Sequence, residues 1–159
     1  MTLRTIVCTL ALMASTAAFA ALKAGDPAPA FSATASLAGK PFTYSLQDSL
    51  AKGPVVVYFY PSAYTEGCNI QAHEFSTQAD QFAAAGASVI GVSLDSIERL
   101  NEFSADPDYC AGRLAVASDG DGRIARSFGL RVSGVQRGTT DTANVARALE
   151  LVQKLSTAR

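Results

Sequence analysis

Val55-Val-Val-Tyr-Phe-Tyr60, continued by Pro61-Ser-Ala-Tyr-Thr-Glu-Gly-Cys68, is the stretch of sequence that decides the fold. Residues 55–60 are β-branched or aromatic without a break, a pattern typical of a strand that is covered on both faces. A helical spacing of apolar residues follows from Cys68 to Gly86. We therefore expect a buried strand, a short turn, and a helix whose first turn carries a cysteine.

This cysteine has the surroundings of a reactive thiol. Unpaired N–H groups and the helix dipole at a helix N-terminus favour the thiolate of Cys68 over the neutral thiol. The Thr65 hydroxyl can donate to and accept from groups at the sulfur, and Pro61 can wall a pocket without adding an N–H donor. The three residues together indicate a peroxide site. The alternatives are an inert, space-filling thiol for Cys68 and a simple helix cap for Thr65.

The rest of the chain continues the alternation of strands and helices. Residues 31–50 alternate apolar and polar side chains around residues 38–41, which predicts a short hairpin or an extended entry segment. Further strands are expected at 88–94 and 114–117. Asp95 or Ser96 can cap a further helix that ends before Pro107, and two more helices are expected at 123–128 and 142–155. The helix residues expected to face the core are Phe75, Ala79, Phe82, Ala83, Ile97, Leu100, Phe103, Val145, Leu149, Val152 and Leu155. Because parallel strands need helical crossovers, this order predicts an α/β fold with parallel or mixed layers.

The spacing Pro61-x-x-x-Thr65-x-x-Cys68 after a hydrophobic strand is the signature of peroxiredoxins. The sequence resembles most closely the branch called peroxiredoxin Q or bacterioferritin comigratory protein. The resemblance runs in order through Gly25–Phe31, residues 58–61, Gly91–Ser96 and Ser118–Gly122 to about Leu130. It implies a thioredoxin-like fold, a mixed sheet flanked by helices.

The resemblance also implies a chemistry for the two cysteines. Cys68 would attack the terminal oxygen of hydrogen peroxide or an organic hydroperoxide and become a sulfenic acid, while Thr65 and an arginine polarise the O–O bond. Cys110, in the loop Ala105-Asp-Pro-Asp-Tyr-Cys110, is the candidate resolving thiol, and a thioredoxin-like partner would reduce the resulting disulfide. The alternative for Cys110 is a structural or bystander thiol.

Three features depart from the family pattern. Gln71 and His73 replace a frequent glutamate and, in some members, a resolving cysteine. His73 is either a hydrogen-bonded surface residue or a cation that tunes the pKa of Cys68. The family also adds a strand pair after Leu130, whose first strand opens with the catalytic arginine, but no strand-like run separates Leu130 from the last helix here. We therefore expect a shortened sheet with an exposed edge beside the active-site strand.

Because the strand pair is missing, the sequence does not identify a single arginine at the catalytic position. Arg137 is the candidate to complete the site and Arg131 is the other possibility, while a surface-loop arginine is the alternative description of both. No metal site or cofactor is expected, because one histidine and scattered cysteines do not make a ligand set.

Residues 1–20 have the character of a bacterial secretory signal. Arg4 precedes the apolar run Ile6–Met13, and Ala18-Phe-Ala20 supplies small residues before a cut. Cys8 would leave with this segment, although a lipoprotein role is the alternative. We therefore predict a thioredoxin-like peroxiredoxin domain at 21–159, in the periplasm or secreted, where disulfides persist.

Composition excludes other partners. The 13 Lys and Arg against 14 Asp and Glu give a formal net charge of −1 with no basic run, so no nucleic-acid partner is expected. No later segment reaches the roughly 20 apolar residues of a membrane span, so no membrane association is expected after signal cleavage. The expected partners are a peroxide and a thioredoxin-like reductant, with the protein a monomer or a homodimer.

The motif and the missing segment favour different functions. A thiol-dependent peroxidase is our prediction, with activity reduced relative to a complete family member. The alternatives are a thiol–disulfide exchange or redox-sensing protein, and a catalytically impaired remnant of the family.

Overall fold

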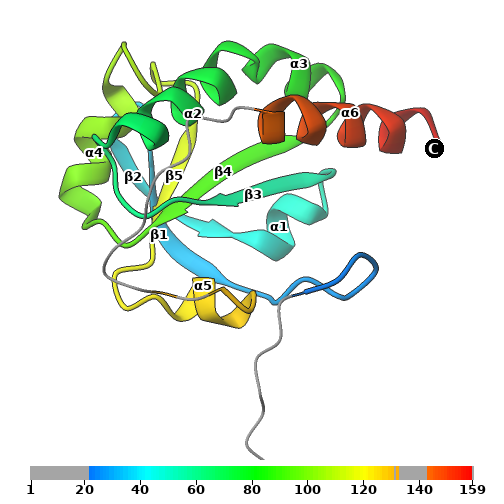
Figure 1. Cartoon of the computed structure of the whole chain (residues 1–159), viewed down its shortest axis with the longest axis horizontal. Helices are drawn as coiled ribbons and strands as arrows, with labels where there is room; N and C mark the ends of the chain where they lie inside the picture. Colours follow the sequence, from blue (N-terminus) through cyan, green and yellow to red (C-terminus); the bar gives the residue numbers. More distant parts are fainter. Residues whose placement is uncertain (1–21, 131, 133–142, 159) are drawn as a thin grey trace, which may run out of the picture.

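The protein is described by a computed structural model over residues 22–130, 132 and 143–158. A five-stranded sheet forms its centre, in the order β2-β1-β5-β4-β3, with helices on both faces (Figure 1). The strands are β1 (Ser32–Leu37), β2 (Lys40–Ser45), β3 (Val55–Phe59), β4 (Ser88–Ser93) and β5 (Ala115–Ser118). The helices are α1 (Leu46–Leu50), α2 (Glu66–Thr77), α3 (Ala79–Ala84), α4 (Ile97–Ala105), α5 (Arg123–Ser127) and α6 (Ala143–Thr157).

The predicted mixed sheet is confirmed. Strands β3, β4 and β5 are parallel neighbours, while β1 runs antiparallel to both β5 and β2. The helices α2 and α3 connect β3 to β4, and α4 connects β4 to β5, as parallel neighbours require. The C-terminal ends of β3 and β4 therefore lie side by side at the same end of the sheet. Residues 61–68 and the residues after Ser93 begin there.

The expected hairpin is present, although its second half is shorter than predicted. Leu37 pairs with Lys40 across a two-residue turn in which Ala38 and Gly39 have φ values of 51° and 77°. The extended interpretation was wrong for Leu46–Leu50, which form α1. The cause is Ser45, whose side chain accepts a hydrogen bond from the Asp48 N–H and caps the helix.

The long helix expected up to Gly86 is divided at Gln78. This residue has φ −94° and ψ 6°, and it ends α2 and begins α3. Ser76 and Thr77 each donate a side-chain hydrogen bond to the carbonyl three residues earlier, which competes with regular helix bonding. Phe75 and Phe82 are buried as predicted, but Ala83 is exposed because the axis changes direction between the two helices.

Two apolar cores lie on the two faces of the sheet. The larger packs α2, α3, α4 and α6 against one face, and the smaller packs α1 and α5 against the other (Figure 1). In α6 the predicted inward residues Val145, Leu149 and Val152 are buried, but Leu155 is 55% exposed. The prediction for Leu155 was wrong because the last turns of α6 extend past the covered part of the fold, as Figure 1 shows.

Strand β3 is the edge of the sheet in the part of the chain that the structure describes. It pairs with β4 on one side only, and Leu130 and Val132 are exposed at 40% and 36%. This agrees with the expectation of a shortened sheet, although residues 131 and 133–142 lie outside the described residues. No helix in the described ranges is long and apolar enough to cross a bilayer. The predicted signal at 1–20 also lies outside them.

Candidate functional site

Cys68 lies in the first turn of α2, which follows β3 after the connecting residues 60–65. The helix begins at Glu66, two residues before the predicted start, so Cys68 is its third residue. The first helical hydrogen bond runs from the Asn69 N–H to the Thr65 carbonyl, so the N–H groups of residues 66–68 have no helical acceptor. Cys68 is only 4% exposed and belongs to the larger core. A thiol is thus enclosed at the positive end of a helix, as the sequence predicted.

Thr65 is the N-cap residue of α2, but its side chain does not cap the helix. Its hydroxyl instead donates to the Ser62 carbonyl at 2.9 Å, which fixes the rotamer and leaves the oxygen with acceptor capacity. The intervening Tyr64 has a φ of 62°, a left-handed conformation that is unfavourable for a bulky residue. The turn between β3 and α2 is therefore strained, and it brings the Thr65 hydroxyl to the start of the helix that carries Cys68.

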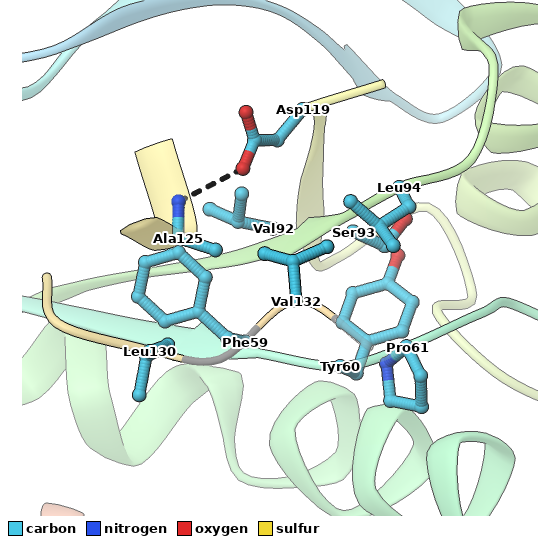
Figure 2. A pocket seen from close by; sticks show the side chains of 10 residues that line it. All are labelled: Phe59, Tyr60, Pro61, Val92, Ser93, Leu94, Asp119, Ala125, Leu130 and Val132. Atoms are coloured by element: carbon cyan, nitrogen blue, oxygen red, sulfur yellow. Dashed lines mark hydrogen bonds between the residues drawn. The ribbon is translucent and has the colours of Figure 1, made fainter. Parts of the chain in front are cut away.

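Pro61 lines a cavity of about 240 Å³ at the C-terminal ends of β3 and β4. Figure 2 shows Tyr60, Pro61 and Ser93 on one side, Leu130 on the opposite side, and Val132 between them. The remaining lining residues are Phe59, Val92, Leu94, Asp119 and Ala125. Neither Thr65 nor Cys68 lines this cavity. Pro61 thus belongs to the turn between β3 and α2 and also lines a mostly apolar cavity.

Cys110 is in the loop after α4, as predicted, and is completely buried. Burial is the main cause that raises the pKa of the Cys110 thiol to about 12, and the nearby Asp106 carboxylate raises it further. Both cysteines are free thiols in the same core. Burial also raises the pKa of Tyr58 well above its ordinary value, with smaller contributions from the neighbouring Tyr60, Cys110 and Cys68. The two sulfurs therefore lie in one apolar region around the tyrosines that end β3.

Two hydrogen bonds hold the Cys110 loop against α2. The Nδ1 atom of His73 donates to the Asp108 carbonyl at 3.0 Å. The Ser76 hydroxyl donates to the Tyr109 carbonyl at 2.9 Å. Of the two alternatives for His73, the structure supports the hydrogen-bonded surface residue. The role of Ser76 could not be predicted, because a hydroxyl inside a helix carries no sequence signal for a partner so far away.

Two further residues, Asp95 and Arg99, contact the motif in a way that the sequence did not predict. Of the two predicted cap candidates, Ser96 caps α4, while the Asp95 carboxylate faces the turn at residues 62–63. Arg99 donates to the Ala63 carbonyl at 2.8 Å. The candidate arginines Arg131 and Arg137 lie outside the described residues, and the described residues hold no cluster of three or more potential metal ligands.

A mixed sheet with an enclosed cysteine in the first turn of the helix after its edge strand is the arrangement of thiol-dependent redox proteins. Comparison with known proteins identifies the family. The AhpC/TSA family profile matches residues 24–154, most of the chain, and the chain belongs to this family.

The similar proteins carry peroxiredoxin names. Peroxiredoxin Bcp of Xanthomonas campestris pv. campestris is 32% identical over 122 residues, which cover 71% of this chain and 73% of that protein. Peroxiredoxin Bcp of Escherichia coli K12 is 36% identical over 109 residues, covering 69% and 65%. The crystal structure of peroxidoxin BcpB from Mycobacterium tuberculosis superimposes with a TM-score of 0.68 at 25% identity, covering 82% of this chain and 96% of that one. The predicted fold and peroxidase class are thus confirmed.

Proposed function

We propose that the protein reduces hydrogen peroxide and organic hydroperoxides through Cys68, with Cys110 as the resolving thiol. The observation that carries this proposal is the enclosed Cys68 in the first turn of α2, preceded by a turn that presents Thr65. The Cys68 thiolate attacks the terminal peroxide oxygen, the O–O bond breaks, and water or an alcohol leaves after taking up a proton. The product is a sulfenic acid on Cys68.

Resolution forms the second bond. The Cys110 sulfur attacks the Cys68 sulfenic acid, water leaves, and a disulfide joins the two residues. A dithiol partner of the thioredoxin type then returns both to thiols and is itself oxidised to a disulfide. We propose that this cycle runs after export and removal of residues 1–20, in an oxidising compartment, in a monomer or homodimer. With Arg137 or another group completing the site less well than in the family pattern, we expect reduced activity.

The test is to mix the reduced protein with a small excess of hydrogen peroxide, quench it at intervals, and follow both thiols by mass spectrometry. We expect oxidation of Cys68 far faster than that of free cysteine, followed by one intramolecular Cys68–Cys110 bridge that a thioredoxin reduces. Oxidation no faster than free cysteine would contradict the peroxidase proposal. Rapid exchange of the bridge with a dithiol would in that case identify a thiol–disulfide exchange protein.

The resolving step requires the Cys110 loop to open. Cys110 is fully buried with a pKa of about 12, so it is neutral at pH 7 and a poor nucleophile until it reaches water. The bonds from His73 and Ser76 to the loop backbone oppose this opening. Local unfolding of this short segment is therefore expected to control the rate at which the disulfide forms.

We predict that Ser76→Ala accelerates disulfide formation about fivefold, because a lost hydrogen bond of about 1 kcal/mol raises the population of the open loop. The initial oxidation of Cys68 should keep its rate. Rapid-quench mass spectrometry after one equivalent of peroxide separates the two steps. Ser127→Ala is the matched control, since the Ser127 hydroxyl also bonds the carbonyl three residues back but belongs to α5. An unchanged or slower resolving step in Ser76→Ala would contradict this role of the hydrogen bond.

A further inference from the structure

Asp95 lies two residues after the C-terminal end of β4 and turns its carboxylate toward the residues between β3 and α2. Its side chain is only 8% exposed. One oxygen accepts from the Ala63 N–H at 2.6 Å and from the Ser93 hydroxyl at 2.9 Å. The other accepts from the Ser62 hydroxyl at 3.0 Å. Two successive residues of the turn between β3 and α2 are thus bound by one carboxylate from the loop after β4.

Arg99 closes the arrangement from the first turn of α4. Its Nε atom lies 3.2 Å from the Asp95 oxygen that also accepts from Ser62, and its NH2 group donates to the Ala63 carbonyl at 2.8 Å. The same guanidinium lies 5.1 Å from the centre of the Tyr64 ring. The N–H and the carbonyl of Ala63 are therefore both held, by two residues that hold each other.

A short series of hydrogen bonds connects this pair to the first turn of α2, which carries Cys68. Asp95 binds Ser62, the Ser62 carbonyl accepts from the Thr65 hydroxyl at 2.9 Å, and the Thr65 carbonyl accepts from the Asn69 N–H at 2.8 Å. Asn69 follows Cys68 in the chain. After the bond from Asp95, the remaining hydrogen bonds join residues within 62–69. A shift of residues 62–63 would therefore move the Thr65 hydroxyl relative to the first turn of α2.

The turn needs such support because it is strained. Tyr64 adopts its left-handed φ of 62° with its ring packed edge-on against Phe103 and Tyr109, at centroid distances of 5.2 and 5.7 Å. Left-handed backbone persists in a non-glycine residue only when its surroundings enforce it. The bonds on Ala63, just before Tyr64, supply part of that enforcement.

We propose that Asp95 is a positioning residue of the peroxide site, acting through Ser62 and Ala63 on Thr65 and Cys68. This role rests on the proposed function of Cys68 as the nucleophile. Asp95 holds the strained turn in the geometry in which the Thr65 hydroxyl and the Cys68 sulfur contact the same peroxide molecule. Arg99 supports it by neutralising the carboxylate and binding Ala63. The chemistry itself remains with Cys68, because the hydrogen bonds and the ion pair of Asp95 and Arg99 described above do not include the Cys68 thiol.

The test is Asp95→Asn, which keeps the shape but turns an NH2 group toward a donor and removes the charge that faces Arg99. We expect the second-order rate constant for Cys68 oxidation by hydrogen peroxide to fall about 10- to 50-fold, since misplacement by a fraction of an ångström is costly at a preorganised site. The rate of Cys68 alkylation by iodoacetamide at the same pH should change less than about threefold, because that reaction does not need Thr65.

The matched control is Asp119→Asn. Asp119 is a comparably buried carboxylate whose side chain accepts from the N–H groups of Ile124 and Ala125, so its loss weakens α5 and not the turn. It should lower the melting temperature while leaving peroxide oxidation near the wild-type rate. Ser62→Ala removes one donor to Asp95 and keeps the hydrogen bonds of the Ala63 N–H and carbonyl with Asp95 and Arg99. It should give an intermediate loss of the peroxide rate, and it replaces Asp95→Asn as the test if that variant folds poorly.

The outcomes separate this role from the proposed function. Wild-type oxidation no faster than free cysteine would refute the proposed function and this role with it. Fast wild-type oxidation that is unchanged in both Asp95→Asn and Ser62→Ala would refute only the positioning role. Equal losses in peroxide oxidation and alkylation, parallel to the loss of melting temperature, would show that Asp95 is merely structural.

Discussion

Replacing Cys68 by serine is expected to lower peroxide consumption at pH 7 by at least about 1,000-fold. A hydroxyl has no accessible anionic form at this pH and is a weak nucleophile without a general base. Cys110 cannot take over, because its burial and its pKa of about 12 keep it neutral in the folded protein. Peroxide loss measured with a coupled thioredoxin system gives the number directly, and thermal melting confirms that the variant is folded.

Cys110→Ser provides the matched comparison, since it removes an equally enclosed sulfur. It should preserve fast oxidation of Cys68 but stop at the sulfenic acid, which excess peroxide converts to the sulfinic acid. No intramolecular disulfide should form, and turnover with thioredoxin should fall. Fast oxidation of Cys110 in the Cys68→Ser protein would reverse the two assignments, and it would contradict the role assigned to the start of α2.

The fold around the motif could be predicted because its signals are local. The unbroken apolar run of β3 and the helical spacing after Cys68 each identify one element within a dozen residues. The alternation of strands and helices then leaves few topologies, because parallel strands require crossovers. The parallel pairing of β3, β4 and β5 and the burial of Phe75, Phe82 and Phe103 follow from these patterns.

The contacts that shape the site are not local and could not be predicted. Asp95 is 32 positions from Ala63, and Ser76 is 33 positions from Tyr109. A carboxylate after a strand and a serine within a helix are both common, and only the three-dimensional packing selects their partners. Asp95 and Ser96 were equivalent cap candidates from the sequence, and only the structure shows that Ser96 caps α4 and leaves Asp95 for the turn.

Gly91→Ala is expected to destabilise the protein by about 3 kcal/mol, which corresponds to a fall in melting temperature of roughly 10 °C. Gly91 lies in the middle of β4 and pairs with Tyr58 of β3. A methyl group there would lie 2.7 Å from both Cζ and the hydroxyl oxygen of Tyr58. The Tyr58 ring cannot retreat, because it is stacked on Phe75 of α2 at a centroid distance of 4.5 Å. Urea unfolding and thermal melting measure the loss.

The clash, not the added methyl group as such, should be responsible for the loss at Gly91. Gly120→Ala is the matched control, because a methyl group at Gly120 meets no atom within 4 Å, and it should leave stability nearly unchanged. Tyr58→Leu shortens the obstructing side chain, so the double variant with Gly91→Ala should be less destabilised than the sum of the two single variants. Strict additivity would show that Tyr58 does not cause the loss. A large coupling would show that the close approach of Tyr58 to β4 sets the position at which Phe75, and with it α2, packs on the sheet.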